Sequence, residues 1–153
     1  MDNNNRTIQL MNAFFKKGRY QGKTGWYGYK IFETKAQPYH YPTPRHWKVA
    51  DGEVLTLKRW EKLNKNTNRE CASGIHFGTY PWIKRHGNCQ MDPTYVKVFK
   101  VFVERENVDN IIVPCGLCTR EADVKVRTDR LTLVHQVDMN TYVVTASVNV
   151  CLL

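Results

Sequence analysis

The chain has 153 residues, 42% of them apolar and 12% aromatic, which is enough for one domain whose core needs neither metal nor disulfides. It has no run of about 18 apolar residues and no apolar leader, so we expect neither a membrane span nor export. The net charge is +9, and residues 1–100 carry 18 Lys and Arg against 7 Asp and Glu. This excess favours a polyanionic partner, nucleic acid or a nucleotide, although a basic surface also serves solubility alone.

Helices are expected in the first ninety residues. Residues 1–6 are rich in Asn, and we expect them to be disordered. A helix is predicted at 7–17, where the apolar residues recur at helical spacing. A second helix is predicted to begin after Thr79, which can cap it. A short third helix is expected at 57–63, with Trp60 turned inward.

Gly18 is expected to end the first helix, and the basic, Gly-rich segment 19–28 to form a loop. Segment 37–45 holds three prolines and is expected to be an extended surface loop. Asp51-Gly52 predicts a hairpin turn within 47–57. The strand at 95–104 is apolar on both faces, so we place it at the centre of the sheet. Further strands are expected at 27–33, 74–77, 111–113, 124–126, 131–137 and 142–152.

These elements predict one α+β domain over residues 1–153, with a mostly antiparallel sheet and two or three short helices in its first two thirds. No phosphate-binding loop, nucleophile elbow or paired-carboxylate pattern occurs in the sequence. The NTPase, hydrolase and glycosidase classes are therefore set aside.

The most distinctive stretch runs from Cys71 through Gly74-Ile75-His76-Phe77. A glycine before a strand lets a flat ligand approach closely. A histidine in a strand either transfers protons near neutral pH or lies half-buried with its ring hydrogen-bonded. With the Tyr29-Lys30-Ile31-Phe32 strand and the Val113-Pro114 turn, this stretch resembles small bacteriophage domains of unknown function. They include the carboxyl-terminal region of the rapid-lysis B proteins of T-even phages. The resemblance spans roughly 27–137 and implies a phage accessory protein that binds a host or phage macromolecule.

The same Gly-Ile-His-Phe strand, followed by a helix and an apolar strand, also resembles the ADP-ribosyltransferase superfamily, which implies a split sheet. His76 stands where the poly(ADP-ribose) polymerase branch has a tyrosine against which nicotinamide stacks. Trp26-Tyr27-Gly28-Tyr29 is similar to that branch's Trp-His-Gly-Thr strand. The resemblance implies an NAD site, so an atypical NAD-dependent ADP-ribosyltransferase is the enzymatic alternative. The cleft expected between the two strands would be lined by His76, Tyr27, Tyr29, Lys30 and Arg120.

Two ligand pairs have the spacing of a zinc site. His86-x-x-Cys89 and Cys115-x-x-Cys118 each place two donors where one tight turn presents them to a tetrahedral zinc ion. The alternative is a histidine at a helix end and free loop thiols. The five cysteines, an odd number, otherwise favour a reducing cytoplasm, that of the host cell for a phage protein.

Basic and aromatic residues alternate in three segments, 16–27, 39–48 and 58–62. In such clusters cations neutralise phosphates while exposed rings stack on bases, which binds single-stranded nucleic acid without sequence readout. The alternative is that the rings belong to the core and the lysines form a solvated face. A plain single-stranded nucleic-acid-binding module is thus a third functional class. Its candidate contacts are Lys16, Lys17, Arg19, Lys23, Tyr39, Tyr41, Arg45, Lys48, Lys58 and Arg59.

Overall fold

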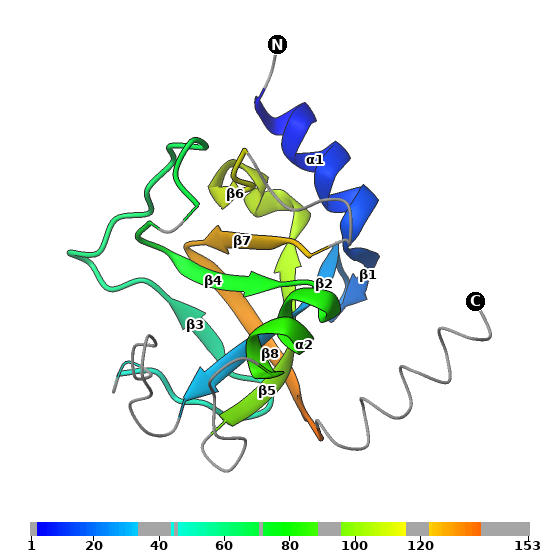
Figure 1. Cartoon of the computed structure of the whole chain (residues 1–153), viewed down its shortest axis with the longest axis vertical. Coiled ribbons are helices and arrows are strands. Elements are labelled where there is room, and N and C mark those ends of the chain that lie inside the picture. The colour runs from blue at the N-terminus through cyan, green and yellow to red at the C-terminus, as the bar shows by residue number, and fades with distance from the viewer. Residues whose placement is uncertain are drawn as a thin grey trace.

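The computed structural model describes residues 3–33, 44, 46–70, 72–88, 96–115 and 123–138. These residues form an α+β fold with a mostly antiparallel sheet and a few short helices, as predicted (Figure 1). In chain order the elements are α1 (Asn3–Phe14), β1 (Lys16–Tyr20), β2 (Lys23–Glu33), β3 (Val54–Thr56), β4 (Ile75–Gly78), α2 (Tyr80–Asn88), β5 (Val96–Glu104), the 3-10 helix η2 (Arg105–Asn110), β6 (Ile111–Ile112), β7 (Lys125–Thr128) and β8 (Arg130–Val137).

The strands follow the order β3-β8-β5-β2-β4-β7-β6, and β1 pairs with β2 outside this path. β5 lies between β8 and β2, the inner position expected from its apolar residues on both faces. Within the described residues β2 and β4 share the single pair Tyr29–Gly78, so the sheet nearly divides there. Figure 1 shows β4 and β7 running across the view, whereas β2, β5 and β8 run diagonally.

The main core lies between the sheet and α1. Met11 of α1 and Phe15, the residue after this helix, are buried there, and the rings of Phe15 and Phe77 lie 5.5 Å apart. Trp26 of β2 is 1% exposed, and its Nε1 donates to Asn12 Oδ1 at 2.9 Å. The apolar stripe predicted for this helix therefore fixes it on the sheet.

Helix α2 packs on the opposite face. Its fully buried Ile83 contacts Ile31 of β2 and Val98 of β5. A Cβ on Gly78 would lie 2.3 Å from Trp82, so glycine at this position lets the helix approach the sheet. No helix in the described part of the chain is long and apolar enough to cross a bilayer.

The start of the chain differs from the prediction. Helix α1 already begins at Asn3, so residues 3–6 are helical and not disordered. The cause is tertiary: Asn4 donates a hydrogen bond to the Asp109 carboxylate, and Arg6 Nη1 donates to the Val113 carbonyl at 2.8 Å. These long-range contacts are invisible in the local sequence.

The predicted helix end and the loop after it are also wrong. Helix α1 ends at Phe14, and Gly18 lies inside β1. Segment 19–28 belongs to a β1–β2 hairpin and not to a loop. Its turn residues Gln21 and Gly22 have φ values of 49° and 78°, as in a type I′ turn. Because this turn carries Gln-Gly and not Asn-Gly, its sequence signal is weak.

The strands of the second half match their predicted bounds, whereas the structure of residues 51–63 differs from the prediction. β4 to β8 lie within two residues of their predicted bounds. Asp51-Gly52 forms a turn, but β3 after it pairs with β8 and not with the residues before the turn. Residues 57–63 are not helical, and Trp60 is 74% exposed. The predicted strand at 142–152 lies outside the described residues.

Candidate nucleic-acid interface

One row of directly opposed residues crosses five strands. In the antiparallel register Lys16 lies opposite Tyr27, Tyr27 opposite Phe102, Phe102 opposite Thr132, and Thr132 opposite Val54. Opposed residues of a sheet project from the same face, so these side chains share one side of β1, β2, β5, β8 and β3. At about 4.8 Å between strands, the row is roughly 19 Å long. Its ends, Lys16 and Val54, are exposed.

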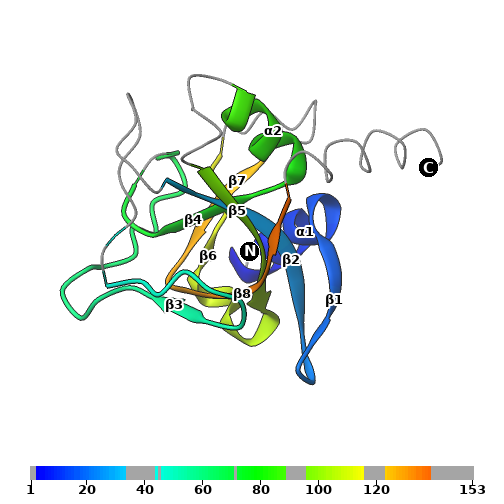
Figure 2. The ribbon, with the colours of Figure 1, turned by 90° about the horizontal axis from the view of Figure 1, so that it is seen from below.

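Two opposed glycines flatten this face. Gly18 of β1 pairs with Gly25 of β2. A Cβ on Gly18 would lie 2.8 Å from Cε2 of Tyr27, and one on Gly25 would lie 2.7 Å from Cζ of Phe102. Because glycine has no side chain, the Tyr27 and Phe102 rings can pack flat against the strand backbone. Figure 2 shows the β1–β2 hairpin, which carries both glycines, extending from the rest of the sheet.

Three rings form one cluster on this surface. Phe102 is at its centre and only 2% exposed. The Tyr20 ring lies 5.5 Å from it at 45°, and the Tyr27 ring 5.0 Å from it at 55°. Both tyrosines are half-buried, and the Tyr27 hydroxyl donates to the carbonyl of Arg19. The two tyrosines thus shield Phe102 from water while remaining partly exposed themselves.

Two ammonium groups accompany the rings. Lys100 Nζ lies 4.4 Å from the centre of the Tyr27 ring, a cation–π contact. Partial burial, and then the charge of nearby Lys16, lower the pKa of Lys100. Among the described residues neither lysine has a carboxylate within ion-pair distance. An anion placed between them would therefore relieve their mutual repulsion.

We call Lys16, Tyr20, Lys23, Tyr27, Lys100 and Phe102 together the tyrosine–lysine face. Lys23 lies at its margin, where it pairs with the exposed Glu106 at 3.8 Å. On the same side a hollow of about 160 Å³ is lined by Glu104 and Glu106 beside Arg130. This acidic margin repels phosphate, so the Lys16–Lys100 end is the part of the face suited to an anion.

The residues predicted to line one cleft have different neighbours in the structure. Tyr27 belongs to the tyrosine–lysine face. Tyr29 lies opposite Gly78, with its ring 6.2 Å from that of Tyr80. Lys30 and His76 do meet, but through the backbone, because Lys30 Nζ donates to the His76 carbonyl at 2.7 Å. Arg120, the fifth cleft candidate, lies outside the described residues.

The Lys30 charge is engaged inside the protein. The residue is 8% exposed, and its Nζ lies 5.2 Å from the Phe32 ring and 5.4 Å from the Trp47 ring. It spans the place where β2 and β4 separate, since its partner carbonyl belongs to His76 of β4. Lys30 therefore joins the two parts of the sheet, and the cleft lining that the sequence predicts for it stays a prediction.

His76 is a neutral residue at neutral pH. Desolvation by burial lowers its pKa from 6.5 to about 4, a hydrogen bond to Ala72 opposes the change, and the charges of Lys125, Lys30 and Arg127 add to it. Nε2 lies 2.7 Å from the Ala72 carbonyl, which can only accept, so Nε2 carries the hydrogen. The observed arrangement is the half-buried, hydrogen-bonded histidine that was the alternative to a proton-transfer role.

The predicted basic clusters divide in the structure. Lys17 and Arg19 alternate with Lys16 and Tyr20 along β1, so they project from the opposite side of the hairpin. Lys48 is paired with Glu53 at 3.3 Å. Lys58 and Arg59 lie on a separate turn. The candidates Tyr39, Tyr41 and Arg45 lie outside the described residues.

Of the predicted zinc ligands, the structure describes only the side chain of Cys115. It is exposed and accepts a hydrogen bond from Arg6 Nη2 at 3.5 Å. The described part of the chain holds no group of three metal-ligating side chains. Cys89, Cys118 and the His86 side chain lie outside that part, so the zinc site stays a prediction.

Sequence reasoning missed Lys100 and Phe102. Both were assigned to a strand buried on both faces, and only the register shows that they share a surface with Tyr27 and Tyr29. The available signal was the two-residue spacing of Lys100 and Phe102, which places them on one side of β5. Comparisons of this chain with family models, with curated proteins and with solved structures found no match. The two resemblances quoted above stay predictions.

Proposed function

We propose that this protein binds single-stranded nucleic acid across the tyrosine–lysine face. The observation that carries the proposal is the Lys100 ammonium held over the Tyr27 ring, with Lys16 near it and no carboxylate partner for either among the described residues. Cations fixed beside half-exposed rings suit a phosphate backbone whose bases are free to stack. Duplex DNA offers the same phosphates but keeps its bases stacked within the helix, so the rings favour a single strand.

The three rings have different tasks in this proposal. Tyr27 is held between Phe102, Lys100 and its own hydroxyl hydrogen bond, so it supports the Lys100 charge. Tyr20 has one ring neighbour, Phe102, and lies near the hairpin tip. We therefore assign base stacking to Tyr20 and phosphate binding to Lys16 and Lys100. The ADP-ribosyltransferase resemblance implies NAD contacts for His76 and Tyr27. Of these two residues, only Tyr27 belongs to the tyrosine–lysine face.

The test is the binding of a labelled oligothymidylate by fluorescence anisotropy over a salt series. Each phosphate contact on a single strand contributes about 0.7 to the slope of log K against log salt, so Lys16→Gln/Lys100→Gln should make the slope shallower by about 1.4. At about 0.1 M salt this double variant should bind roughly 10- to 30-fold more weakly. Wild-type binding that does not change with salt would overturn the proposal.

The matched control is Lys84→Gln/Lys97→Gln, which removes two exposed charges of α2 and β5 outside the tyrosine–lysine face. If binding depends on this site and not on overall charge, the control should keep the wild-type slope to within a few tenths. Equal losses in both double variants would mean that net charge alone attracts the oligonucleotide. In that case the tyrosine–lysine face has no special role.

A further inference from the structure

The most exposed large apolar side chain of the described residues lies outside the tyrosine–lysine face. Trp60 is 74% exposed, on the segment that follows β3. Tryptophan normally buries its large ring, and a single exposed apolar residue alone would need no explanation. The structure around Trp60 adds three observations: a turn closed by hydrogen bonds, a cation near the ring, and a cluster of positive charges without an ion pair among the described residues.

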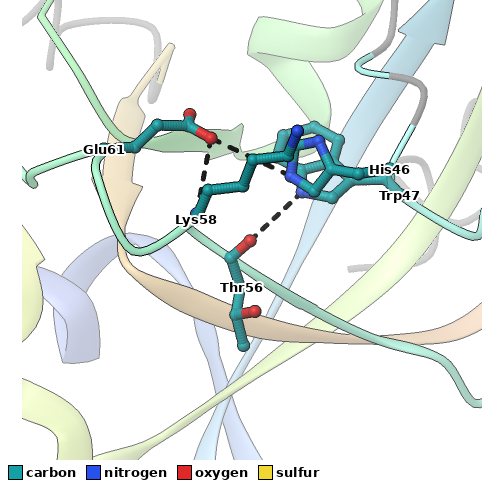
Figure 3. Close-up of polar contacts among 5 residues, drawn as sticks. All are labelled: His46, Trp47, Thr56, Lys58 and Glu61. Atoms are coloured by element: carbon teal, nitrogen blue, oxygen red, sulfur yellow. Dashed lines mark hydrogen bonds and ion pairs between the residues drawn. The ribbon is translucent and has the colours of Figure 1, made fainter.

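The turn is closed from both sides. The backbone N–H of Glu61 donates to the Lys58 carbonyl at 2.9 Å, and the Glu61 carboxylate accepts from the backbone N–H of Lys58 at 3.3 Å. The same carboxylate lies 3.9 Å from Nε2 of His46 (Figure 3). Arg59 and Trp60 are therefore presented at the tip of a turn whose ends are tied together.

The base of the turn is anchored to the sheet. Leu57 donates its backbone N–H to the Asp129 carbonyl at 3.1 Å and packs against the main core. Trp47 Nε1 donates to the Thr56 carbonyl at 3.2 Å at the end of β3, as Figure 3 shows. Because these contacts order the backbone, little further entropy is lost when a ligand meets the tip.

The charge around Trp60 is positive. Lys58 Nζ lies 5.0 Å from the centre of the indole ring. Arg59, Lys62 and Lys65 are exposed, and none of them has an ion pair among the described residues. Glu61, the acid within this turn, is engaged with His46 and the Lys58 backbone. A single exposed ring surrounded by positive charges is suited to stack on one base while the charges bind the adjacent phosphates. A stable protein interface needs many more apolar side chains.

We propose that the Trp60 turn is a second contact for the same single-stranded nucleic acid, with Trp60 stacking on a base and Arg59 and Lys62 binding phosphate. This inference rests on the proposed function. The row that starts at Lys16 ends at Val54 on β3, and β3 ends two residues before Lys58. A strand that follows this row passes the hollow lined by Glu104, Glu106 and Arg130 with its phosphates turned towards solvent, and then reaches the edge from which the Trp60 turn extends. Two linked contacts on one ligand raise its affinity beyond that of either contact alone.

The experiment measures tryptophan fluorescence and anisotropy together, with an oligothymidylate of about 16 nucleotides, within the range of known single-strand sites. We expect the oligonucleotide to quench wild-type emission, because a base stacks on an exposed indole. Trp60→Leu should abolish the quenching and weaken binding by roughly 10-fold or more. Trp82→Phe, which changes the α2 ring that packs against Gly78 of β4, is the control and should retain the quenching.

The outcomes separate the two proposals. If Trp60→Leu binds and is quenched like the wild type while Lys16→Gln/Lys100→Gln loses affinity, the Trp60 contact is wrong and the tyrosine–lysine face stands. The reverse result leaves the Trp60 turn as a nucleic-acid site and rejects the face. Binding of wild type, but not of Trp60→Leu, to anionic phospholipid vesicles without any response to oligonucleotide would overturn the inference in favour of a membrane surface.

Discussion

The ammonium nitrogen of Lys100 lies over the ring of Tyr27 on the neighbouring strand, 4.4 Å from the ring centre. Lys100 is itself opposite Tyr29 in the register, so it reaches diagonally to Tyr27. The ring's negative face attracts the charge and holds it over Tyr27, beside the β1–β2 hairpin. The cation is thus positioned before any ligand arrives, which reduces the entropy lost on binding.

The first prediction concerns Tyr20, the ring to which we assign base stacking. Tyr20→Leu should weaken oligothymidylate binding by about 1–3 kcal/mol, because base–aromatic stacking contributes that much per base. Tyr20→Phe keeps the ring and should bind within a few-fold of the wild type. Fluorescence anisotropy at constant salt measures both. Equal affinities for Tyr20→Leu and Tyr20→Phe would show that the aromatic ring contributes nothing to binding.

The second prediction concerns the glycines of the β1–β2 hairpin. A Cβ on Gly25 would lie 2.0 Å from the carbonyl oxygen of Val103, so Gly25→Ala forces β2 and β5 apart. We expect a loss of about 2–3 kcal/mol in the free energy of unfolding, as for other overpacked sites. Urea denaturation followed by circular dichroism measures it.

Gly22→Ala is the matched control for this variant. Nothing lies within 4 Å of its added Cβ, and only the φ of 78° opposes the change. A loss of about 1 kcal/mol is expected from that backbone conformation. Should both variants unfold at the same urea concentration, close strand packing at Gly25 is not what requires glycine there.

Elements with strong local patterns were predicted well. β5 was placed centrally from its continuous apolar run, and the start of α2 was predicted from Thr79. The β1–β2 hairpin was missed because Gly18 and Gly25 read as breakers, although here they allow rings to lie on the sheet. A glycine's meaning depends on what lies across the strand, and local sequence does not contain that information.

The candidate site was only half predictable for the same reason. Lys16, Lys23 and Tyr27 lie close in sequence and were identified as one basic aromatic cluster. Lys100 and Phe102 join them only through the β2–β5 register. Trp60 was predicted to turn inward, because the spacing of Trp60 and Leu63 suits one helix face. The turn closed by Lys58 and Glu61 replaces that helix and leaves the indole exposed.

The third prediction concerns Arg127, which is fully buried on β7. Its guanidinium donates to the carbonyls of Asn64, Arg69 and Asn66 at 2.8, 2.7 and 2.8 Å. These bonds attach the loop at 64–69 to the sheet. Arg127→Gln leaves these three carbonyls without their charged donor, so we expect a loss of about 3 kcal/mol in unfolding free energy.

Limited proteolysis gives a second readout for this variant. Arg127→Gln should be cleaved faster within 64–69 than the wild type, because the loop loses its attachment. The control is Arg130→Gln, an exposed residue at the start of β8, the next strand in the chain, which should change stability by less than about 0.5 kcal/mol. Unchanged cleavage within 64–69 would show that other contacts hold the loop.

The fourth prediction follows from the pKa of His76, which burial lowers to about 4 in the folded protein. In the unfolded chain the pKa is near 6.5, so the unfolded state binds the proton more tightly. His76 therefore costs no stability above pH 6.5, and the protein loses stability as the pH falls from 6.5 towards 4. The full loss is about 3 kcal/mol, since one pKa unit corresponds to about 1.4 kcal/mol.

His76→Gln isolates this effect, because its amide can still donate to the Ala72 carbonyl but does not titrate. Carboxylates contribute equally to both proteins, so the difference between their unfolding free energies reports His76 alone. Urea denaturation at a series of pH values from about 7 to about 4 should show the wild type losing stability more steeply. Parallel curves would mean that the imidazole is protonated in the folded protein as readily as in the unfolded chain. In that case neither burial nor the neighbouring cations would lower the pKa of His76.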